Sequence, residues 1–286
     1  MPLLALTILT MIFFAANSLL NRAALAGDHI GPAEFAALRV VSGALMLWCL
    51  VALRAGPRAA FRRPDWVAVA GLVAYLVGFS FAYLQLDAGL GAVILFGGVQ
   101  LTMFTGALVE GERPAPLRWA GIALSLGGLV YLGWPGVVVP LPPVSLALMA
   151  IAAVGWGIYS LAGRRVSDPL AATASNFIYA VPLLVLVALV AGSGLSPTPT
   201  GLGLAVVSGA LTSGLGYALW YRVLPELGAT RGALAQLSAP VFALVGGAIL
   251  LAEPISARAA IASALILGGI VLGVWGKRQS GPKHGA

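Results

Sequence analysis

The sequence is poor in charge. Asp, Glu, Lys and Arg make up only 9% of its 286 residues, against about 25% in a soluble globular domain. Hydrophobic residues make up 60%, and the mean hydropathy is +1.00. Because the shortage of charge extends along the whole length, the composition predicts an all-α integral membrane protein and excludes a soluble domain.

Cysteine and histidine are scarcer still. Cys49 is the one cysteine, which excludes a disulfide within the chain and a cysteine-based metal cluster. The two histidines, His29 and His284, lie outside the apolar runs, so we expect no metal and no cofactor. No paired carboxylates and no nucleophile–base pair fall at membrane depth, and we therefore do not expect an enzyme.

Ten segments approach the roughly 20 apolar residues that a helix needs to cross a bilayer. The connections between them hold turn-forming or charged residues, as in RAGPRAAFRRPD (54–65), and none is long enough for a soluble domain. The predicted spans are residues 3–25, 33–53, 66–86, 90–109, 117–134, 144–163, 171–191, 202–223, 232–251 and 258–276.

Basic residues are distributed unequally between the two sides of these spans. If the N-terminus lies on side one, that side holds thirteen of the sixteen Lys and Arg residues, the other side holds two, and Arg39 falls within a span. Basic connections stay in the cytoplasm, so both termini are predicted to be cytoplasmic, in a bacterial-type inner (plasma) membrane. The net charge of +7 then reflects topology rather than a nucleic-acid partner.

The sequence resembles itself when it is displaced by 141 residues. ALSLGGLV (123–130) meets ALILGGIV (264–271), and Glu112 meets Glu253. With a displacement of 142, NSLLNR (17–22) meets YSLAGR (159–164). The chain therefore divides into two five-helix units, residues 1–135 and 144–276, followed by a short polar tail, 277–286.

Each unit has an odd number of helices, so the second unit enters the membrane upside down relative to the first. Inverted repeats are typical of secondary transporters, which bind a substrate near the midplane where the two halves meet. This construction predicts alternating access. The expected partners are a small-molecule substrate and the lipid bilayer, with no obligatory protein partner.

Two motifs carry a resemblance to a known family. Each unit ends with a glutamate that is followed by fourteen residues and a Gly-Gly pair, at Glu112 and at Glu253. PAEFAALRVVSGAL (32–45) is similar to the second helix of the EamA-type repeat, with Arg39 at its usual Arg, whereas the second unit has Asn176 there. Over nearly its whole length the chain therefore resembles the drug/metabolite transporter superfamily.

A narrower resemblance concerns the substrate. GWGIYS (155–160) looks like the first helix of the second EamA unit. Its Trp156–Tyr159 pair, with the aromatic-rich third helix, is most similar to amino-acid exporters, including those for aromatic amino acids. The resemblance implies amino-acid export.

Polar and aromatic side chains within the spans are candidate substrate contacts. Asn17 and Asn21 share one face of the first helix, and Tyr159 takes the place of Asn17 in the second unit. An amide in hydrocarbon needs a hydrogen-bonding partner, so this face lines a cavity or bonds to a neighbouring helix. The aromatic residues of the third helix either line the same cavity or pack. The predicted substrate-binding residues are Asn17, Tyr75, Phe79, Tyr83, Gln100, Trp156, Tyr159 and Gln236.

Other residues have a specific expected role or several alternatives. Arg39 has three alternatives: it snorkels to the interface, it is held by a carbonyl or by Glu34, or it contacts a substrate carboxylate. Pro182 and Pro240 are gating kinks or tolerated ones. We expect Glu112 and Glu253 each to cap the helix that follows it. At the cytoplasmic end of the eighth span we expect an interfacial aromatic belt of Tyr217, Trp220 and Tyr221.

The acidic residues bear on the energy source. All nine lie in connections or at helix ends, so we expect no proton coupling through a midplane carboxylate. The favoured function is a secondary transporter that exports amino acids or related small metabolites. The alternative is a flippase or carrier for a lipid-linked or larger amphiphilic metabolite, which a lateral opening toward lipid would favour.

Overall fold

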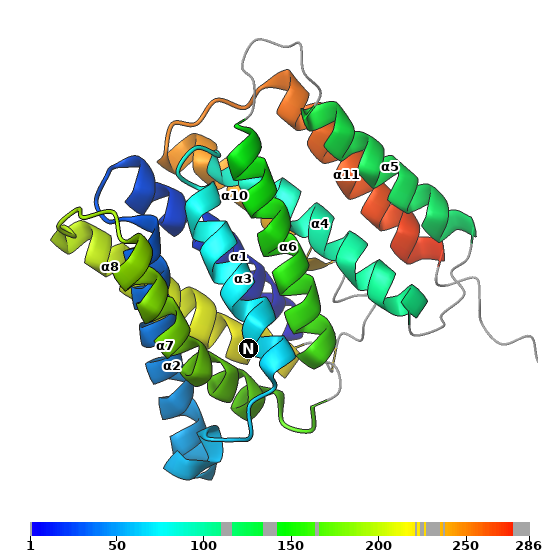
Figure 1. Cartoon of the computed structure of the whole chain (residues 1–286). Coiled ribbons are helices and arrows are strands. Elements are labelled where there is room, and N and C mark those ends of the chain that lie inside the picture. Colours follow the sequence, from blue (N-terminus) through cyan, green and yellow to red (C-terminus); the bar gives the residue numbers. More distant parts are fainter. Residues whose placement is uncertain are drawn as a thin grey trace, which may run out of the picture.

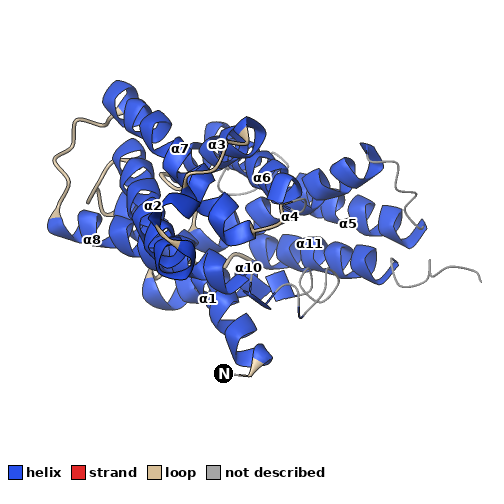
Figure 2. Cartoon of the chain, turned by 90° about the horizontal axis from the view of Figure 1, so that it is seen from below, coloured by secondary structure: helices blue, strands red, loops and turns tan. Residues whose placement is uncertain are grey.

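The computed structural model describes residues 2–109, 116–133, 142–163, 166–220, 222–223, 226, 235–236 and 238–276. Within these ranges the protein is helical and has no strand (Figure 2). Glu112, Tyr221 and the predicted polar tail, 277–286, lie outside the described residues.

Each of the ten predicted spans coincides with a helical stretch. One difference is that α3 ends four residues early, because residues 83–86 form a turn. A second is a π-helix, η2, that interrupts the eighth span. The elements are α1 (Leu3–Ala26), α2 (Pro32–Ala55), η1 (Pro57–Ala60), α3 (Trp66–Ala82), α4 (Ala88–Val109), α5 (Pro116–Gly133), α6 (Pro143–Gly163), α7 (Pro169–Ala191), α8 (Pro199–Val207), η2 (Ser208–Leu215), α10 (Ser238–Leu250) and α11 (Ala257–Gly276).

Five of these helical stretches are long and apolar enough to cross a membrane. They are Leu3–Ala26, Pro32–Ala55, Pro143–Gly163, Leu170–Ala191 and Pro199–Trp220. The other apolar helices within the described residues have apolar stretches of 10–17 residues. The protein is therefore a multi-pass membrane protein.

Local sequence signals mark where several helices begin. Proline stands in the first turn of α2, α7 and α8, where its missing N–H costs nothing. The side chains of Asp65, Asp168 and Thr198 accept hydrogen bonds from the first free N–H groups of α3, α7 and α8. These caps fix the residues at which α3, α7 and α8 begin.

Helix packing is preserved when the two units are exchanged. α6 packs on α3, and its equivalent α1 packs on α8 and η2, which are the equivalents of α3. In the same way α6 packs on α4, and α1 packs on α10, the equivalent of α4. Likewise α2 packs on η2 as α3 packs on α7. The equivalent helices α2 and α7 contact each other, as do α4 and α10, and α5 and α11. α5 and α11 lie side by side at one edge of the molecule (Figure 1).

Equivalent helices run in opposite directions where they meet. At one end of α2, Arg54 bonds to Asp168 at the start of α7, while at the other end Glu34 bonds to Ser193 just after α7. In the α5–α11 pair, Gly121 approaches the backbone of Gly269 so closely that either residue has no room for a Cβ. The Gly-rich face of α11 is therefore used for packing within the chain.

Candidate functional site

A continuous group of aromatic rings occupies the interior where the two units meet. Trp156 of α6 is its centre, with ring centroids 4.9 Å from Tyr75, 5.1 Å from Tyr217 and 5.5 Å from Tyr159. Because the rings come from both units, any relative movement of the units must rearrange them. This aromatic cluster consists of Phe14, Tyr75, Phe79, Tyr83, Trp156, Tyr159, Phe177, Tyr217 and Trp220.

Two glycines bring α3 and α6 close enough for these rings to stack. A Cβ on Gly155 would lie 2.6 Å from the carbonyl oxygen of Gly71, and a Cβ on Gly71 would lie 2.8 Å from that of Gly155. Glycine is needed at both positions because no larger residue permits this approach. The neighbouring Trp156 and Tyr75 are thereby set side by side.

Arg39 of α2 lies against the cluster and is fully buried. Its Nε donates to Ser213 Oγ at 3.1 Å, and its Nη2 donates to the Tyr75 hydroxyl at 2.9 Å. The guanidinium carbon also lies 5.3 Å and 5.0 Å from the ring centroids of Tyr75 and Phe79, within cation–π range. Removing a charge from water costs several kcal/mol, and these contacts offset part of that cost.

Asn17 connects α1 to the π-helix η2. Its Oδ1 accepts hydrogen bonds from Ser208 at 3.0 Å and Ser213 at 3.3 Å, and also from the Thr212 hydroxyl. Its Nδ2 donates to the Thr212 carbonyl at 3.3 Å, an acceptor that the wide turn of a π-helix makes accessible. Since Ser213 also accepts from Arg39, one buried polar network joins α1, α2 and η2.

At one end of the molecule Arg22 joins the two units. Its Nε lies 3.2 Å from Glu253 Oε1, and its Nη1 donates to the carbonyls of Tyr83 and Leu84 at 3.1 Å each. Glu253 Oε2 accepts from the Ala88 N–H at 2.8 Å. We call this set, Arg22, Tyr83, Leu84, Ala88 and Glu253, the end lock, because it joins the two units across one end.

The end lock corrects one sequence-based expectation. Glu253 does not cap the helix that follows it, since Ser256 Oγ accepts from the Ala259 N–H at the start of α11. Glu253 instead satisfies a free N–H at the start of α4, in the other unit. Burial raises the pKa of Glu253, and the Ala88 N–H and Arg22 act in the opposite direction.

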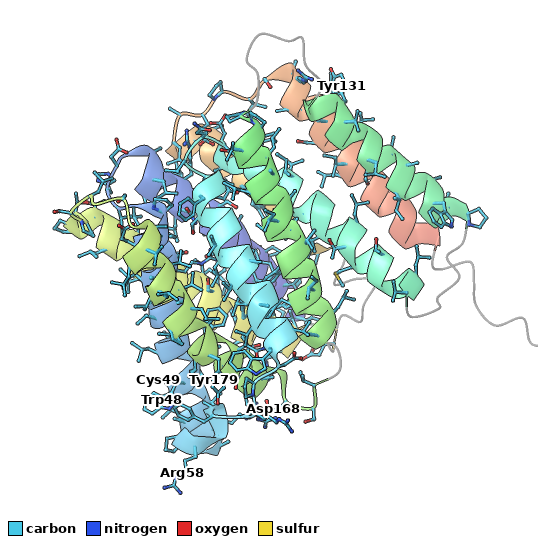
Figure 3. All side chains as sticks on the ribbon, viewed as in Figure 1. Trp48, Cys49, Arg58, Tyr131, Asp168 and Tyr179 are labelled. Carbon is cyan, nitrogen blue, oxygen red and sulfur yellow. The ribbon has the colours of Figure 1, made fainter. Side chains whose placement is uncertain are left out.

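The other end, which carries the basic connections, holds an open cavity of about 290 Å³. Asp168, labelled at this end in Figure 3, pairs with Arg54 at 2.7 Å and with Arg62 at 3.3 Å. The cavity lies between the α2–α3 connection, the end of α6 and the start of α7. Its lining includes Arg62, Arg63, Asp65, Tyr159, Gly163, Ser167, Thr173, Ser175 and Asn176.

The predicted substrate-binding residues fall into three groups. Tyr159 lines the open cavity. Asn17 and Trp156, 3% and 9% exposed, are packed inside. Tyr75 and Phe79 of α3, and Tyr83 directly after it, are buried as well. For Asn17 this fits the alternative of bonding to a neighbouring helix. Gln100 and Gln236 are half-buried on α4 and before α10. Their contact with substrate stays a prediction.

The two predicted kink residues differ in position. Pro182 is an exposed residue in the middle of α7. Pro240 is buried near the start of α10 as it is described. A gating role for either one remains a prediction.

Two residues lie elsewhere than predicted, and three others were not predicted. Tyr217 and Trp220 are only 3% and 8% exposed and belong to the aromatic cluster, so the expectation of an interfacial belt is wrong for both. Ser208, Thr212 and Ser213 were also missed. The signal for them was three hydroxyl residues close together inside an apolar span.

A protein-family comparison identifies this architecture. The model of the EamA-like transporter family matches residues 1–134 and again residues 144–275. The chain belongs to the EamA-like transporter family. It is thus a membrane transporter of small molecules in the drug/metabolite transporter superfamily.

This EamA-family protein is similar to two curated proteins and to a solved structure. An uncharacterized protein of Pseudomonas aeruginosa is 47% identical over 269 residues, which cover 94% of this chain and 93% of the relative. An uncharacterized transporter of Archaeoglobus fulgidus is 25% identical over 206 residues, 71% of this chain and 73% of the relative. A solved crystal structure with 24% identity has the same fold, with a TM-score of 0.66 over 96% of this chain and 98% of that one.

Proposed function

We propose that this EamA-family protein exports amino acids or related small metabolites by alternating access. In this proposal two inverted five-helix units cross a bacterial-type inner membrane ten times, with both termini in the cytoplasm. The packing that survives exchange of the units supports the inversion, as do the antiparallel α2–α7 and α5–α11 pairs. The basic connections at the open end support a cytoplasmic orientation for that end.

One observation carries the proposal: among the described residues, a cavity lies at one end of the molecule and the end lock joins the two units at the other. The cavity at the basic end reaches Tyr159 of the aromatic cluster, whereas the end lock joins the two units at the opposite end. A two-unit protein with one end open and the other closed is suited to alternation between two states. The state described here is then the inward-open one.

The aromatic cluster supports a small substrate with an apolar body. Trp156 packs against Tyr75 and against Tyr159, and Tyr159 lines the cavity. The nearby polar network offers hydroxyl and amide groups. Among the described acids, each lies in a connection or at a helix end. We therefore propose that transport is not proton-coupled through a midplane carboxylate.

Counterflow in proteoliposomes tests this function. Liposomes loaded with unlabelled amino acid are diluted into a labelled panel, and the initial uptake is compared with that of protein-free liposomes. Trp156→Ala should lower the exchange at least tenfold, and Trp156→Phe should retain a part of it. Phe61→Ala, at an exposed position in the α2–α3 connection, should leave the exchange unchanged.

Three results would contradict the proposal. Exchange that is equal in wild type and Trp156→Ala would exclude the aromatic cluster from the pathway. Absence of exchange for the whole panel, together with scrambling of a fluorescent lipid, would favour the flippase alternative. Accumulation of substrate only under an imposed pH gradient would overturn the absence of proton coupling.

A further inference from the structure

The charge of Arg39 is not balanced by any acid within the described part of the chain. The ion pairs there join Arg22 to Asp87 and Glu253, and join Arg54 and Arg62 to Asp168. Arg39 faces hydroxyls and rings, and its Nη1, which is buried, has no acceptor. A buried guanidinium with an N–H group that has no acceptor can bind a carboxylate or another oxyanion, because these ligands match its geometry.

The internal repeat shows how a ligand would reach this site. The open cavity is lined by Tyr159, Gly163 and Asn176. In the first unit Tyr159 and Gly163 correspond to Asn17 and Asn21, through the match of YSLAGR with NSLLNR. Aligning PLAATASN (169–176) with PAEFAALR (32–39) makes Arg39 the counterpart of Asn176. If the two units exchange their conformations, a second cavity forms in the first unit. The counterparts of Tyr159, Gly163 and Asn176, which are Asn17, Asn21 and Arg39, would then line it.

A second buried polar atom near this end has no hydrogen-bonding partner among the described residues. Asn21 donates to Ser80 at 3.3 Å, but its Oδ1 is buried without a partner. Buried polar groups are normally satisfied. Both Asn21 and Arg39 thus keep an unsatisfied group in the present state, and opening of this end relieves both.

We propose that, in the oppositely opened state, Arg39 lines a second cavity with Asn17 and Asn21 and binds the anionic group of the substrate. The inference rests on the proposed transport function and narrows its substrate to small organic anions, such as carboxylates, with an apolar or aromatic body. A zwitterion fits less well, because its ammonium group finds no carboxylate among the described residues at this site. Asp65 and Asp168 are occupied as caps of α3 and α7.

This substrate charge also supplies an energy source. Moving a net negative charge outward across an inside-negative membrane is favourable without a coupled proton. Export of an anion therefore needs no titratable group in the central pathway, which agrees with the placement of the acids. Transport is expected to be electrogenic.

Three probes with the same phenyl body separate the charge classes: phenylpyruvate (anion), phenylalanine (zwitterion) and phenethylamine (cation). In counterflow, phenylpyruvate should exchange at least tenfold faster than phenethylamine and clearly faster than phenylalanine. With a potassium diffusion potential that is positive inside, phenylpyruvate should accumulate tenfold at about 60 mV. The same potential should leave phenylalanine unaffected.

Variants assign the preference to Arg39. Arg39→Asn, which copies the counterpart residue, should lose the preference for phenylpyruvate, while Arg39→Lys should retain part of it. Arg58→Asn is the matched control, because Arg58 is exposed at the basic end and points away from the helices (Figure 3). If Arg39→Asn does not fold, thermal stabilisation of the wild type decides: phenylpyruvate should raise the melting temperature more than phenylalanine does.

The outcomes distinguish this inference from the proposed function. Phenylalanine exchange that equals or exceeds that of phenylpyruvate and ignores the membrane potential would overturn the anion site while leaving amino-acid transport intact. A phenylpyruvate preference that persists in folded Arg39→Asn would place the anion site elsewhere. Exchange of none of the three probes, nor of any panel amino acid, would overturn both proposals together.

Discussion

Arg22→Gln is expected to open the end of the molecule that the end lock joins. Arg22 makes one charge-assisted hydrogen bond to Glu253 at 3.2 Å and two bonds to backbone carbonyls at 3.1 Å, with its side chain 19% exposed. Hydrogen bonds to charged groups contribute about 1.5–3 kcal/mol each. Water replaces part of this after opening, so we assign about 3 kcal/mol to the set, which is on the order of 100-fold in the closed-to-open ratio.

Labelling of a buried cysteine measures this shift. Asn21→Cys introduces the reporter on α1, in a Cys49→Ala background that removes the native, exposed thiol. A membrane-impermeant maleimide is added from the side of the end lock. Arg22→Gln should accelerate labelling by up to roughly 100-fold, because the reagent reacts with the open population.

Arg58→Gln, an exposed change at the other end of the molecule, is the control and should leave the rate unchanged. Labelling of the Arg22→Gln protein at the wild-type rate would refute the end lock as a closure. Acceleration that occurs only when the reagent is added from the basic end would refute the assignment of the open and closed ends.

Three further predictions concern packing, the polar network and pH. Gly155→Ala should destabilise the protein by about 1–3 kcal/mol, because the added methyl overpacks α3 against α6. The measurement is a lower melting temperature in detergent. Gly127→Ala is the control and should not lower it, because a Cβ at that position meets open space. A double-mutant cycle of Asn17→Ala and Thr212→Val should give a coupling of about 1 kcal/mol; additive losses would exclude the buried network. Because burial raises the pKa of Glu253 from its usual 4.5, closure is favoured below pH 4.5 and weakens as pH rises through the raised value. Labelling of the Asn21→Cys reporter should therefore accelerate as the pH rises from 4.5 through the raised pKa, more than it does in the Glu253→Gln variant. The same pH dependence of labelling in both proteins would contradict this.

The helices were predictable because their positions depend on local sequence. Hydropathy alone placed helical stretches at all ten expected positions, since an apolar run of this length must satisfy its backbone internally. The match of YSLAGR with NSLLNR made Asn17 and Tyr159 counterparts before any coordinates were considered. Capping by Asp65 and Asp168 is equally local.

The errors concern partners that are distant in the sequence. Glu253 satisfies Ala88 of the other unit rather than its own following helix, and no local pattern distinguishes these two uses of a carboxylate. Tyr217 and Trp220 lie near a predicted helix end, yet they pack against Phe14 of α1. Their burial follows from the way α1 crosses η2, which depends on the packing of the whole bundle.

By itself the sequence determined that this chain lies in a membrane, where its helices are and which residues of its two units correspond, because hydropathy, capping and repetition are properties of neighbouring or repeated residues. Only the tertiary structure decided which end holds the open cavity, which residues join the two units at the other end and that Arg39 is buried without a carboxylate partner among the described residues. Those facts depend on distances between helices far apart in the chain, where packing and desolvation act on the assembled bundle.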